Sequence, residues 1–524
     1  MNKDYDVIIV GAGHNGMVAA NYLARDGKRV AVIERLGKVG GMTSSGYMIP
    51  EAPEHLVTPC AVEIIFMRGT GIIEDLDLHK HGLQTIDPDP SYAYLHPDGS
   101  SVALFRDPKR TADDMARLSR SDGRNYLKFM ETIDAMMDIG LPMMMADPGR
   151  YKFSDITKLL GALIRNRKLR TELTNLASGT ADQIACEWFE HPANIALLTN
   201  IAGGVGPVDE DGNAAAYMLF GLLHRLGVGK PVGSLQSLSN ALASSFESVG
   251  GKIHLNAPVQ EIVIQDGETR GVKLEDGKMI TADVVVATCD PQTAYKMTTP
   301  GGIDKRYMTR MEHAPAARNN VAPLLANIAM SKPLSLKRHQ ELRHDDADLN
   351  KAVGLIGTPE EVRENFSAAI RGKLPRRYAV SVSPLNNWDP SQAPEGQSIA
   401  YVYLPGVAVD IDGGWDANKD KCMTDALAQV SEFYDGFDSE IGRFVETPPE
   451  RARRMNVTNG CVVHIDFTSS RAGLKRPAYE LGGPRPVVPG FFLGGSGTHP
   501  GGGVSGLPGK HAAGRVSRYL KKKR

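Results

Sequence analysis

The sequence is poor in cysteine, in aromatic residues and in long apolar runs. Its 524 residues include only five cysteines and 6% aromatic residues, and no two cysteines form a Cys-x-x-Cys pair. This spacing argues against a disulfide framework and a thiolate metal site, and it is typical of reduced, buried thiols in a cytoplasmic protein. No apolar run reaches the length of a membrane span, and the first apolar strand begins almost at once. We therefore expect neither a transmembrane helix nor a signal peptide.

Charge and missing motifs exclude several functional classes. The chain carries 60 basic and 61 acidic residues, so no overall basic field favours a nucleic-acid partner. Neither a Ser/His/Asp order, nor His-Glu-x-x-His, nor a Walker sequence occurs, so hydrolysis and phosphoryl transfer have no support. We expect no metal. The basic run at residues 521–524 is either a solvated helix end or a weak membrane contact.

Residues 5–35 contain the pattern around which the chain is organised. An apolar run is followed by Gly-x-Gly-x-x-Gly, a helical apolar spacing, a second β-branched run and an acid, Glu34. In this setting the glycines serve a tight turn, close approach to a pyrophosphate and helix–strand packing. The pyrophosphate would lie at the helix N-terminus, and Glu34, 18 positions beyond Gly16 (34 − 16), would accept hydrogen bonds from a ribose. The predicted dinucleotide site contains Gly11, Ala12, Gly13, Asn15, Gly16 and Glu34.

The residues after Glu34 narrow the expected cofactor to FAD. Arg35 is followed at a short interval by the pair Gly40-Gly41 and by Met42 and Thr43. This segment resembles the Glu-(Arg/Lys)-x-x-x-x-Gly-Gly pattern of the two-dinucleotide-binding-domain flavoproteins. In that group the glycine pair lets the chain pass close to the flavin side of the cofactor. The resemblance implies non-covalent FAD, with Arg35, Gly40, Gly41, Met42 and Thr43 among its binding residues.

Residues 229–300 are richer in short strands. A helix is expected over 233–249, followed by strands over 252–255, 259–265, 271–274, 278–282 and 284–287, joined by Asp-Gly turns. This arrangement predicts a β-meander that returns to the first sheet. The last run resembles the second FAD fingerprint of the same flavoproteins, a strand ending in Ala-Thr-Gly, although Cys289 replaces the glycine here. Val259 lies where that group has its adenine-contacting valine.

The remaining segments predict helices and a second sheet. We expect a hairpin over 92–95 and 102–105, one helix over 111–137, and strands alternating with helices over 301–450. The methionine-rich residues 135–145 are either a loosely specified core helix or the wall of a lipophilic tunnel. Residues 156–173 predict a basic amphipathic helix. It either packs on the core or lies at a membrane interface through which an apolar substrate enters.

The C-terminal segment carries the most specific resemblance. Residues 491–506 read Phe-Phe-Leu-Gly-Gly-Ser-Gly-Thr-His-Pro-Gly-Gly-Gly-Val-Ser-Gly and precede an alanine-rich helix. This segment is similar to that of the phytoene desaturase-like group of the amine-oxidase superfamily. The nearest subgroup contains the pyridine nucleotide-disulphide oxidoreductase domain-containing protein two and the bacterial β-carotene ketolase relatives. Residues 459–464 and Arg476-Pro477 also resemble that subgroup. The resemblance adds Gly495, Ser496, Gly503 and Val504 to the expected FAD site.

These patterns predict an α/β fold of the two-dinucleotide-binding-domain type. A Rossmann-like FAD domain with a β-meander would be joined to a mixed α+β substrate domain. The FAD domain is expected to be discontinuous, with residues 1–75, 229–300 and 455–524. The substrate domain is expected to comprise residues 76–228 and 301–454.

The function implied is an FAD-dependent oxidoreductase acting on C–C bonds of a lipophilic substrate, which is carotenoid-, terpenoid- or lipid-like. The reaction would proceed by hydride transfer to flavin N5. His499 and His464 are the catalytic candidates, each with a purely structural alternative. Two other functions stay open. One is a non-catalytic lipid or prenyl-protein binding module of the GDP-dissociation-inhibitor type, and the other is a flavin amine oxidase. Peripheral membrane contact and homo-oligomers are further expectations.

Overall fold

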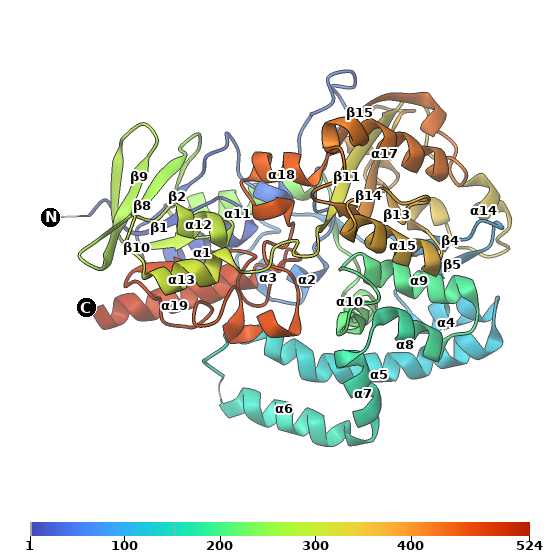
Figure 1. The fold of residues 1–524 in the computed structure, drawn as a ribbon, viewed down its shortest axis with the longest axis horizontal. Coiled ribbons are helices and arrows are strands. Elements are labelled where there is room, and N and C mark those ends of the chain that lie inside the picture. The colour runs from blue at the N-terminus through green and yellow to red at the C-terminus, as the bar shows by residue number, and fades with distance from the viewer. Residues whose placement is uncertain (1–2, 152, 524) are drawn as a thin grey trace.

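Two large sheets lie side by side along the molecule (Figure 1). The structure is a computed structural model that describes residues 3–151 and 153–523. The first sheet has the order β7–β2–β1–β10–β9–β8, with β16 also paired to β10. Its strands are β1 (Tyr5–Val10), β2 (Val30–Ile33), β7 (Lys252–His254), β8 (Val259–Gln265), β9 (Glu268–Leu274), β10 (Met279–Ala287) and β16 (Phe491–Leu493).

The first sheet is parallel where it carries the glycine turns and antiparallel in its meander. β1 pairs in parallel with β2 and β10, and β16 pairs in parallel with β10. β8, β9 and β10 form the antiparallel meander. The expected break inside residues 278–287 is wrong, because β10 is one continuous strand. Asp283 is accommodated within it by an ion pair with Lys3 at the surface.

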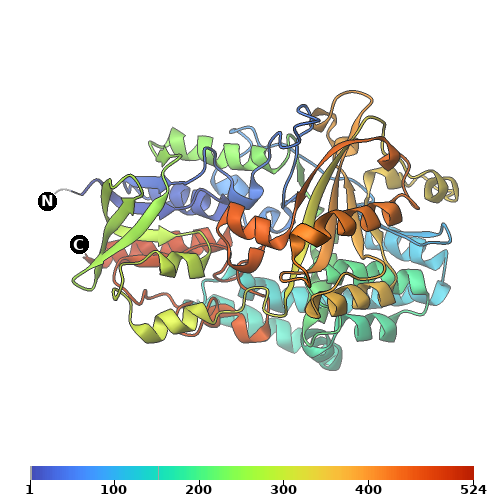
Figure 2. The same ribbon diagram turned by 45° about the horizontal axis from the view of Figure 1, so that its top comes forward.

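Side chains alternate between the two faces of this sheet, and because its strands are buried, both faces are apolar. Helices therefore cover both of them. Val7 and Ile9 of β1 pack against α1 (His14–Arg25), α11 (Leu235–Ser248) and α19 (Leu507–Lys523). Ile8 and Val10 face the opposite side, towards α12 (Pro291–Lys296) and α13 (Lys305–Glu312). Figure 2 shows α19 beside α1, although the two helices come from opposite ends of the chain. The fold is therefore the expected α/β class.

The second sheet has the order β15–β11–β14–β13–β12–β4–β5. Its neighbours are antiparallel except for β12 and β4. The strands are β4 (Tyr92–Leu95), β5 (Ser101–Leu104), β11 (Val321–Met330), β12 (Val353–Ile356), β13 (Val380–Pro384), β14 (Ser398–Ala408) and β15 (Glu440–Glu446). One face packs on α17 (Trp415–Val430), and the other packs on α9 (Pro192–Gly203) and α15 (Pro359–Ile370). The predicted hairpin of β4 and β5 is confirmed.

A layer of helices packs against the second sheet. The single helix expected over residues 111–137 is in fact two helices. α4 (Pro108–Ala116) and α5 (Arg120–Met145) are separate, because the hydroxyl of Ser119 accepts from the Asp122 amide and begins a new helix. α8 (Ala181–Trp188) and α10 (Met218–Leu226) complete the layer. The methionine-rich end of α5 is part of a helix. Met137 is buried, whereas Met143 is 43% exposed.

The predicted amphipathic helix is also divided in two. α6 (Phe153–Arg165) and α7 (Arg170–Ser178) are separated by a 3-10 turn. α6 lies at the lower edge in Figure 1, below α5, and Ala162 is its only buried residue. The alternative in which this segment packs its apolar face on the core is therefore wrong for α6. Across residues 3–151 and 153–523, no helix is long and apolar enough to cross a bilayer.

Candidate active site

The carboxyl ends of β1, β2, β10 and β16 meet at one edge of the first sheet, where ligands bind in open α/β folds. The turn after β1 is tight. Gly11 has a φ of 104°, and a Cβ placed on Gly16 would lie 2.1 Å from the Gly11 carbonyl oxygen. Only glycine allows α1 to begin so close to the strand.

Glu34 at the end of β2 holds this turn through a buried carboxylate. Its Oε2 accepts from the Ala12 amide at 2.8 Å, and its Oε1 accepts from the Leu36 amide at 2.9 Å. A carboxylate has about four acceptor positions, so it retains capacity for two ribose hydroxyls. The neighbouring Ala257 amide donates to the Glu34 carbonyl oxygen, which brings the start of β8 and Val259 towards the same strand end. This geometry suits an adenosine site.

The glycine pair after β2 is pressed against the first glycine turn. The Gly40 amide donates to the Ala12 carbonyl oxygen at 2.9 Å, and Gly40 forms a β-bridge with Gly13. A Cβ on Gly41 would lie 3.3 Å from the Gly13 Cα. The Thr43 hydroxyl donates to the Gly40 carbonyl oxygen at 2.7 Å and fixes the following turn.

Met42 and Arg35, which lie near the glycine pair in sequence, make hydrogen bonds to other parts of the chain. Met42 uses its carbonyl oxygen to accept from the Ala61 amide. Arg35 is exposed, and its guanidinium donates to the Arg454 carbonyl oxygen. The side chain of Arg35 is therefore engaged with residue 454 and not with the glycine turns.

The C-terminal loop closes over the start of α1. The Asn15 Nδ2 donates to the Ser496 hydroxyl at 3.1 Å, which joins residues 481 positions apart. A Cβ on Gly495 would lie 2.4 Å from the Thr288 carbonyl oxygen. Gly503 and Val504 both have positive φ angles, of 95° and 55°. A β-branched residue in this region is a strained exception of the kind that gathers at functional sites.

The loop glycines at 501–503 are required by protein neighbours. Cβ atoms at Gly501, Gly502 and Gly503 would lie about as close as 2.4, 3.0 and 2.9 Å to the side chains of Phe467, Val463 and Phe66. The loop therefore packs tightly on residues 463–467. Its approach to a flat flavin ring stays a prediction.

The side chains at the start of α1 fit FAD. The His14 Nε2 and the Asn15 Oδ1 are buried and have no hydrogen-bond partner. Buried polar atoms of this kind need a partner. They lie at a helix N-terminus, beside glycine turns that leave the backbone accessible, which is the arrangement that binds a pyrophosphate. FAD would satisfy them.

His464 lies beside His14 in this cluster. It has a φ of 62°, is 9% exposed, and its Nδ1 has no partner. Burial lowers the pKa of His464, the carboxylate of Asp290 opposes this shift, and the cation of Arg476 adds to it. Burial, with a smaller contribution from His464, lowers the pKa of His14 to about 4. Both imidazoles are therefore neutral at neutral pH.

Arg476 fixes the backbone on both sides of His464. Its guanidinium is 1% exposed and donates to the carbonyl oxygens of Val463, Ile465 and Asp466 at 3.2, 2.6 and 3.0 Å. It also donates to the Ser496 carbonyl oxygen in the C-terminal loop at 3.3 Å. One side chain therefore joins the His464 turn to the loop over α1.

His499 contacts α5 and α19. Its Nε2 lies 3.2 Å from the Met143 carbonyl oxygen, and its ring stacks on His511 with centroids 5.9 Å apart. Burial is the main cause that lowers the pKa of His499. The two catalytic candidates have different neighbours, and of these two only His464 has an imidazole nitrogen that is buried without a partner.

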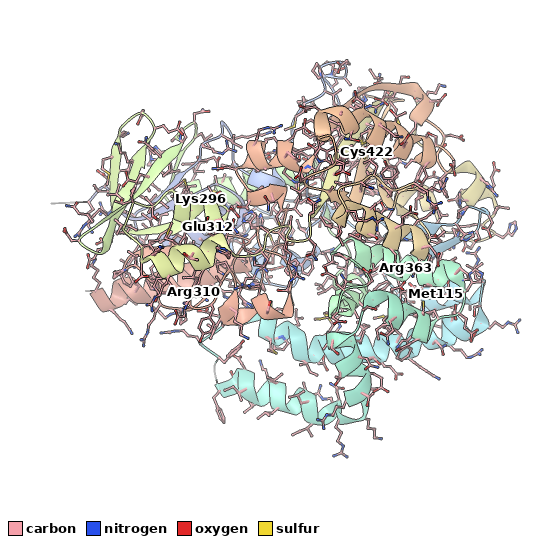
Figure 3. All side chains as sticks on the ribbon, viewed as in Figure 1. Met115, Lys296, Arg310, Glu312, Arg363 and Cys422 are labelled. Atoms are coloured by element: carbon pink, nitrogen blue, oxygen red, sulfur yellow. The ribbon has the colours of Figure 1, made fainter. Side chains whose placement is uncertain are left out.

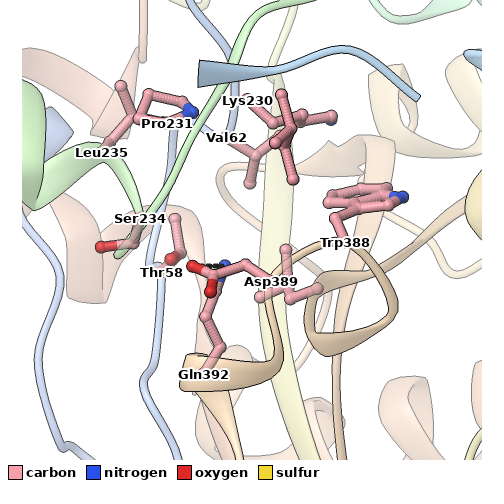
Figure 4. A pocket seen from close by; sticks show the side chains of 11 residues that line it. Thr58, Val62, Lys230, Pro231, Ser234, Leu235, Trp388, Asp389 and Gln392 are labelled. Atoms are coloured by element: carbon pink, nitrogen blue, oxygen red, sulfur yellow. Dashed lines mark hydrogen bonds between the residues drawn. The ribbon is translucent and has the colours of Figure 1, made fainter. Parts of the chain in front are cut away.

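A buried ion pair lies beside a small pocket that Lys230 and Trp388 help to line (Figure 4). Lys230 is buried, pairs with Glu63 at 3.1 Å and lies 4.1 Å from the centroid of the Trp388 ring. The Tyr92 hydroxyl donates to the same carboxylate at 2.9 Å. Lys230 lies in the short strand β6 (Lys230–Pro231), Trp388 ends the helix α16 (Leu385–Trp388), and Tyr92 lies in β4, so the group joins β6 to the second sheet.

Sequence reasoning missed the residues whose importance depends on tertiary packing. His14 occupies a variable position of the glycine motif, and only its burial beside His464 marks it. Asp290 follows β10 and accepts from the Thr458 hydroxyl at 2.8 Å, which ties two distant segments together. Among the described residues, no group of three or more His, Cys, Asp or Glu side chains could hold a metal ion.

The strand–turn–helix unit, the buried acid and the closing glycine loop define an FAD-binding oxidoreductase of the two-dinucleotide-binding-domain type. The family described as "Flavin containing amine oxidoreductase" matches residues 16–516, so the chain belongs to this family. The protein is an FAD-dependent oxidoreductase.

Relatives of this family match nearly the whole chain in sequence. It is 27% identical to pyridine nucleotide-disulfide oxidoreductase domain-containing protein 2 of Rattus norvegicus, over 99% of this chain and 94% of the relative. It is 24% identical to the neurosporene-forming phytoene desaturase of Rhodobacter capsulatus, over 96% and 91%. These matches confirm the suspected subgroup. A crystal structure of an oxidoreductase from Methanosarcina mazei has the same fold, with a TM-score of 0.60, 15% identity and coverage of 98% and 99%.

We predict that Glu34→Ala lowers FAD occupancy and leaves the apoprotein folded. The change removes the acceptor for the ribose and for the Ala12 and Leu36 amides. Losing one charged hydrogen-bonding group costs about 1.5–3 kcal/mol, which weakens FAD binding on the order of tenfold to a hundredfold. The measurement is FAD released by acid precipitation per mole of protein, with exposed Glu312→Ala as the matched control. Equal FAD retention in both variants would remove the assignment.

Proposed function

We propose that this oxidoreductase acts on C–C bonds of a lipophilic substrate of the carotenoid, terpenoid or lipid type. The observation that carries the proposal is the full-length likeness to a phytoene desaturase. Beside the second sheet, Val57, Leu325, Leu385 and Tyr401 form one buried apolar cluster.

FAD, when bound, accepts the hydride and supplies the redox chemistry. The chain's own residues bind and orient it. Glu34 and the start of α1 would hold the adenosine and the pyrophosphate. Residues 40–43 and the loop 494–504 would hold the flavin side.

We assign the acid–base or orienting role to His464 in preference to His499. The His464 ring is neutral, its Nδ1 is free, and Arg476 holds its backbone. It can therefore accept a proton or a hydrogen bond at that atom. His499 stays the second candidate, because its Nε2 is already bonded to a backbone carbonyl.

Neither alternative function has better support. An amine oxidase with an aromatic cage needs two rings that face each other across the substrate. On β14, Tyr401 and Tyr403 are two positions apart, so their rings stack side by side on one face of the strand, with centroids 6.3 Å apart, and do not form opposite walls of a cage. A non-catalytic binding module would have no need of the FAD site described above.

Product analysis tests the proposal. The FAD-loaded enzyme is incubated with a terpenoid or polyene hydrocarbon and, separately, with an alkylamine of matched length. We expect a hydrocarbon product that differs by one pair of hydrogen atoms and no aldehyde from the amine. An aldehyde from the amine, with the hydrocarbon unchanged, would support the amine oxidase instead.

A further inference from the structure

α6 presents its large apolar side chains to solvent. Five of them lie on one side of the helix at spacings of three, four, three and one residues. Their exposed fractions are 80% for Phe153, 46% for Ile156, 53% for Leu160, 47% for Leu163 and 66% for Ile164. Figure 3 shows α6 and its side chains at the lower edge of the molecule, with no other segment below the helix. A contiguous exposed apolar face of this size marks an interaction surface.

The basic residues around this apolar face indicate which kind of partner it binds. Residues 153–170 contain five basic side chains and one acidic side chain, and all five basic residues are exposed: Lys158, Arg165, Arg167, Lys168 and Arg170. An apolar face flanked by Lys and Arg suits a bilayer that contains anionic lipids. A second copy of the chain fits less well, because a two-fold contact would bring the same basic residues together.

The base of α6 is anchored beside the C-terminal loop. Asp147, in the connection from α5, accepts from Arg515 at 2.6 Å and from Arg518 at 2.9 Å, both on α19. Four residues earlier, the Met143 carbonyl oxygen contacts His499. The exposed helix therefore extends from the part of the fold where the methionine-rich end of α5 meets the loop over the FAD site.

We propose that α6 lies in the headgroup region of an anionic bilayer, and that lipophilic substrate passes from the bilayer to the active site along the end of α5. This inference rests on the proposed function, because it supplies the route for an apolar substrate. Met143, Met144 and Met145 suit such a passage, since unbranched thioether side chains adapt to ligands of irregular shape. Met143 is exposed and Met144 and Met145 are half-buried, so all three are accessible along the route.

Vesicle sedimentation tests the surface. The variant is Leu160→Glu/Leu163→Glu, with exposed fractions of 53% and 47%, and the matched control is Leu342→Glu/Ile370→Glu, with 52% and 48%. The FAD-loaded proteins are mixed with phosphatidylglycerol vesicles and with phosphatidylcholine vesicles. We expect wild type and control to bind the anionic vesicles preferentially. Binding of the α6 variant should fall about tenfold or more, because it loses apolar insertion and gains two repelled charges.

Each other outcome overturns the inference. Equal binding by the α6 variant and the control would show that α6 does not meet lipid. If the variant instead loses self-association in sedimentation velocity while vesicle binding is unchanged, a second copy covers this face. Unfolding temperature and FAD content must match wild type, which is expected because the changed side chains are exposed. Redox activity on detergent-dispersed substrate is measured separately, so failure of the proposed function is distinguishable from failure of the lipid surface.

Discussion

Arg476→Met should destabilise the folded protein by about 3 kcal/mol or more and abolish tight FAD binding. The guanidinium is buried and donates to four carbonyl oxygens, three around His464 and one at Ser496. Methionine fills similar space but has no donor, so these buried acceptors lose their partners at a cost of about 1–3 kcal/mol each where no water replaces them. The loop over α1 and the His464 turn should then separate.

Urea unfolding of the apoprotein and titration with FAD measure these effects. Lys475→Met is the matched control, because its side chain is exposed one position earlier. Arg476→Lys should recover little of the lost stability or FAD affinity, because an ammonium group cannot reach the same set of acceptors as a planar guanidinium. A stable Arg476→Met protein with wild-type FAD affinity would show that the guanidinium does not organise the site.

His464→Gln should slow flavin reduction by about 10²–10⁴-fold, the usual contribution of a positioned acid–base group. FAD content should be unchanged, because glutamine retains a polar side chain of similar reach. The rate of flavin reduction is measured by anaerobic rapid mixing with substrate in excess. His499→Gln is the comparison, and we expect it to change the rate much less. The opposite ranking of the two variants would transfer the catalytic role to His499.

The pH dependence of the same rate gives a second test of His464. Its pKa lies below the ordinary value of 6.5, chiefly because it is buried. If the neutral ring accepts the proton, the rate should be constant around neutral pH and fall only in acid, as the ring becomes protonated. Removing the Arg476 cation relieves one cause of the lowered pKa. The acid limb of Arg476→Lys should therefore stay nearly in place, and that of Arg476→Met, where FAD can be supplied in excess, should move to higher pH.

The parts of the fold that depend on local sequence were predictable. The turn after β1 needs Gly11 and Gly16 at fixed spacing, and Glu34 follows at the end of the next strand, so one short segment predicts the cofactor site. The meander is equally local, because its Asp-Gly turns fall between β-branched runs. The predicted strand break at Asp283 was wrong, because the Asp283 carboxylate is accommodated inside β10 by an ion pair with Lys3, 280 positions away.

The parts that depend on distant contacts could not be read from the chain. His14 and His464 are 450 positions apart (464 − 14), and their nearness is set by the packing of the loop over α1. Arg476 is not part of a periodic sequence pattern. Its contacts with the backbone carbonyls around His464 are visible only in the structure. For α6, the amphipathic pattern is the same whether its apolar face packs inward or outward. The sequence could therefore state both alternatives but not choose between them.

Anaerobic absorbance spectroscopy of the FAD-loaded protein tests the central claim most directly. The protein is mixed with a detergent-dispersed terpenoid or polyene, and the oxidised or reduced state of the flavin is followed in both directions, starting from each state. The account predicts that purified protein carries non-covalent FAD and that a lipophilic hydrocarbon changes its redox state, while an amine of matched size does not. A protein that binds no FAD, or FAD that responds to the amine alone, would contradict it.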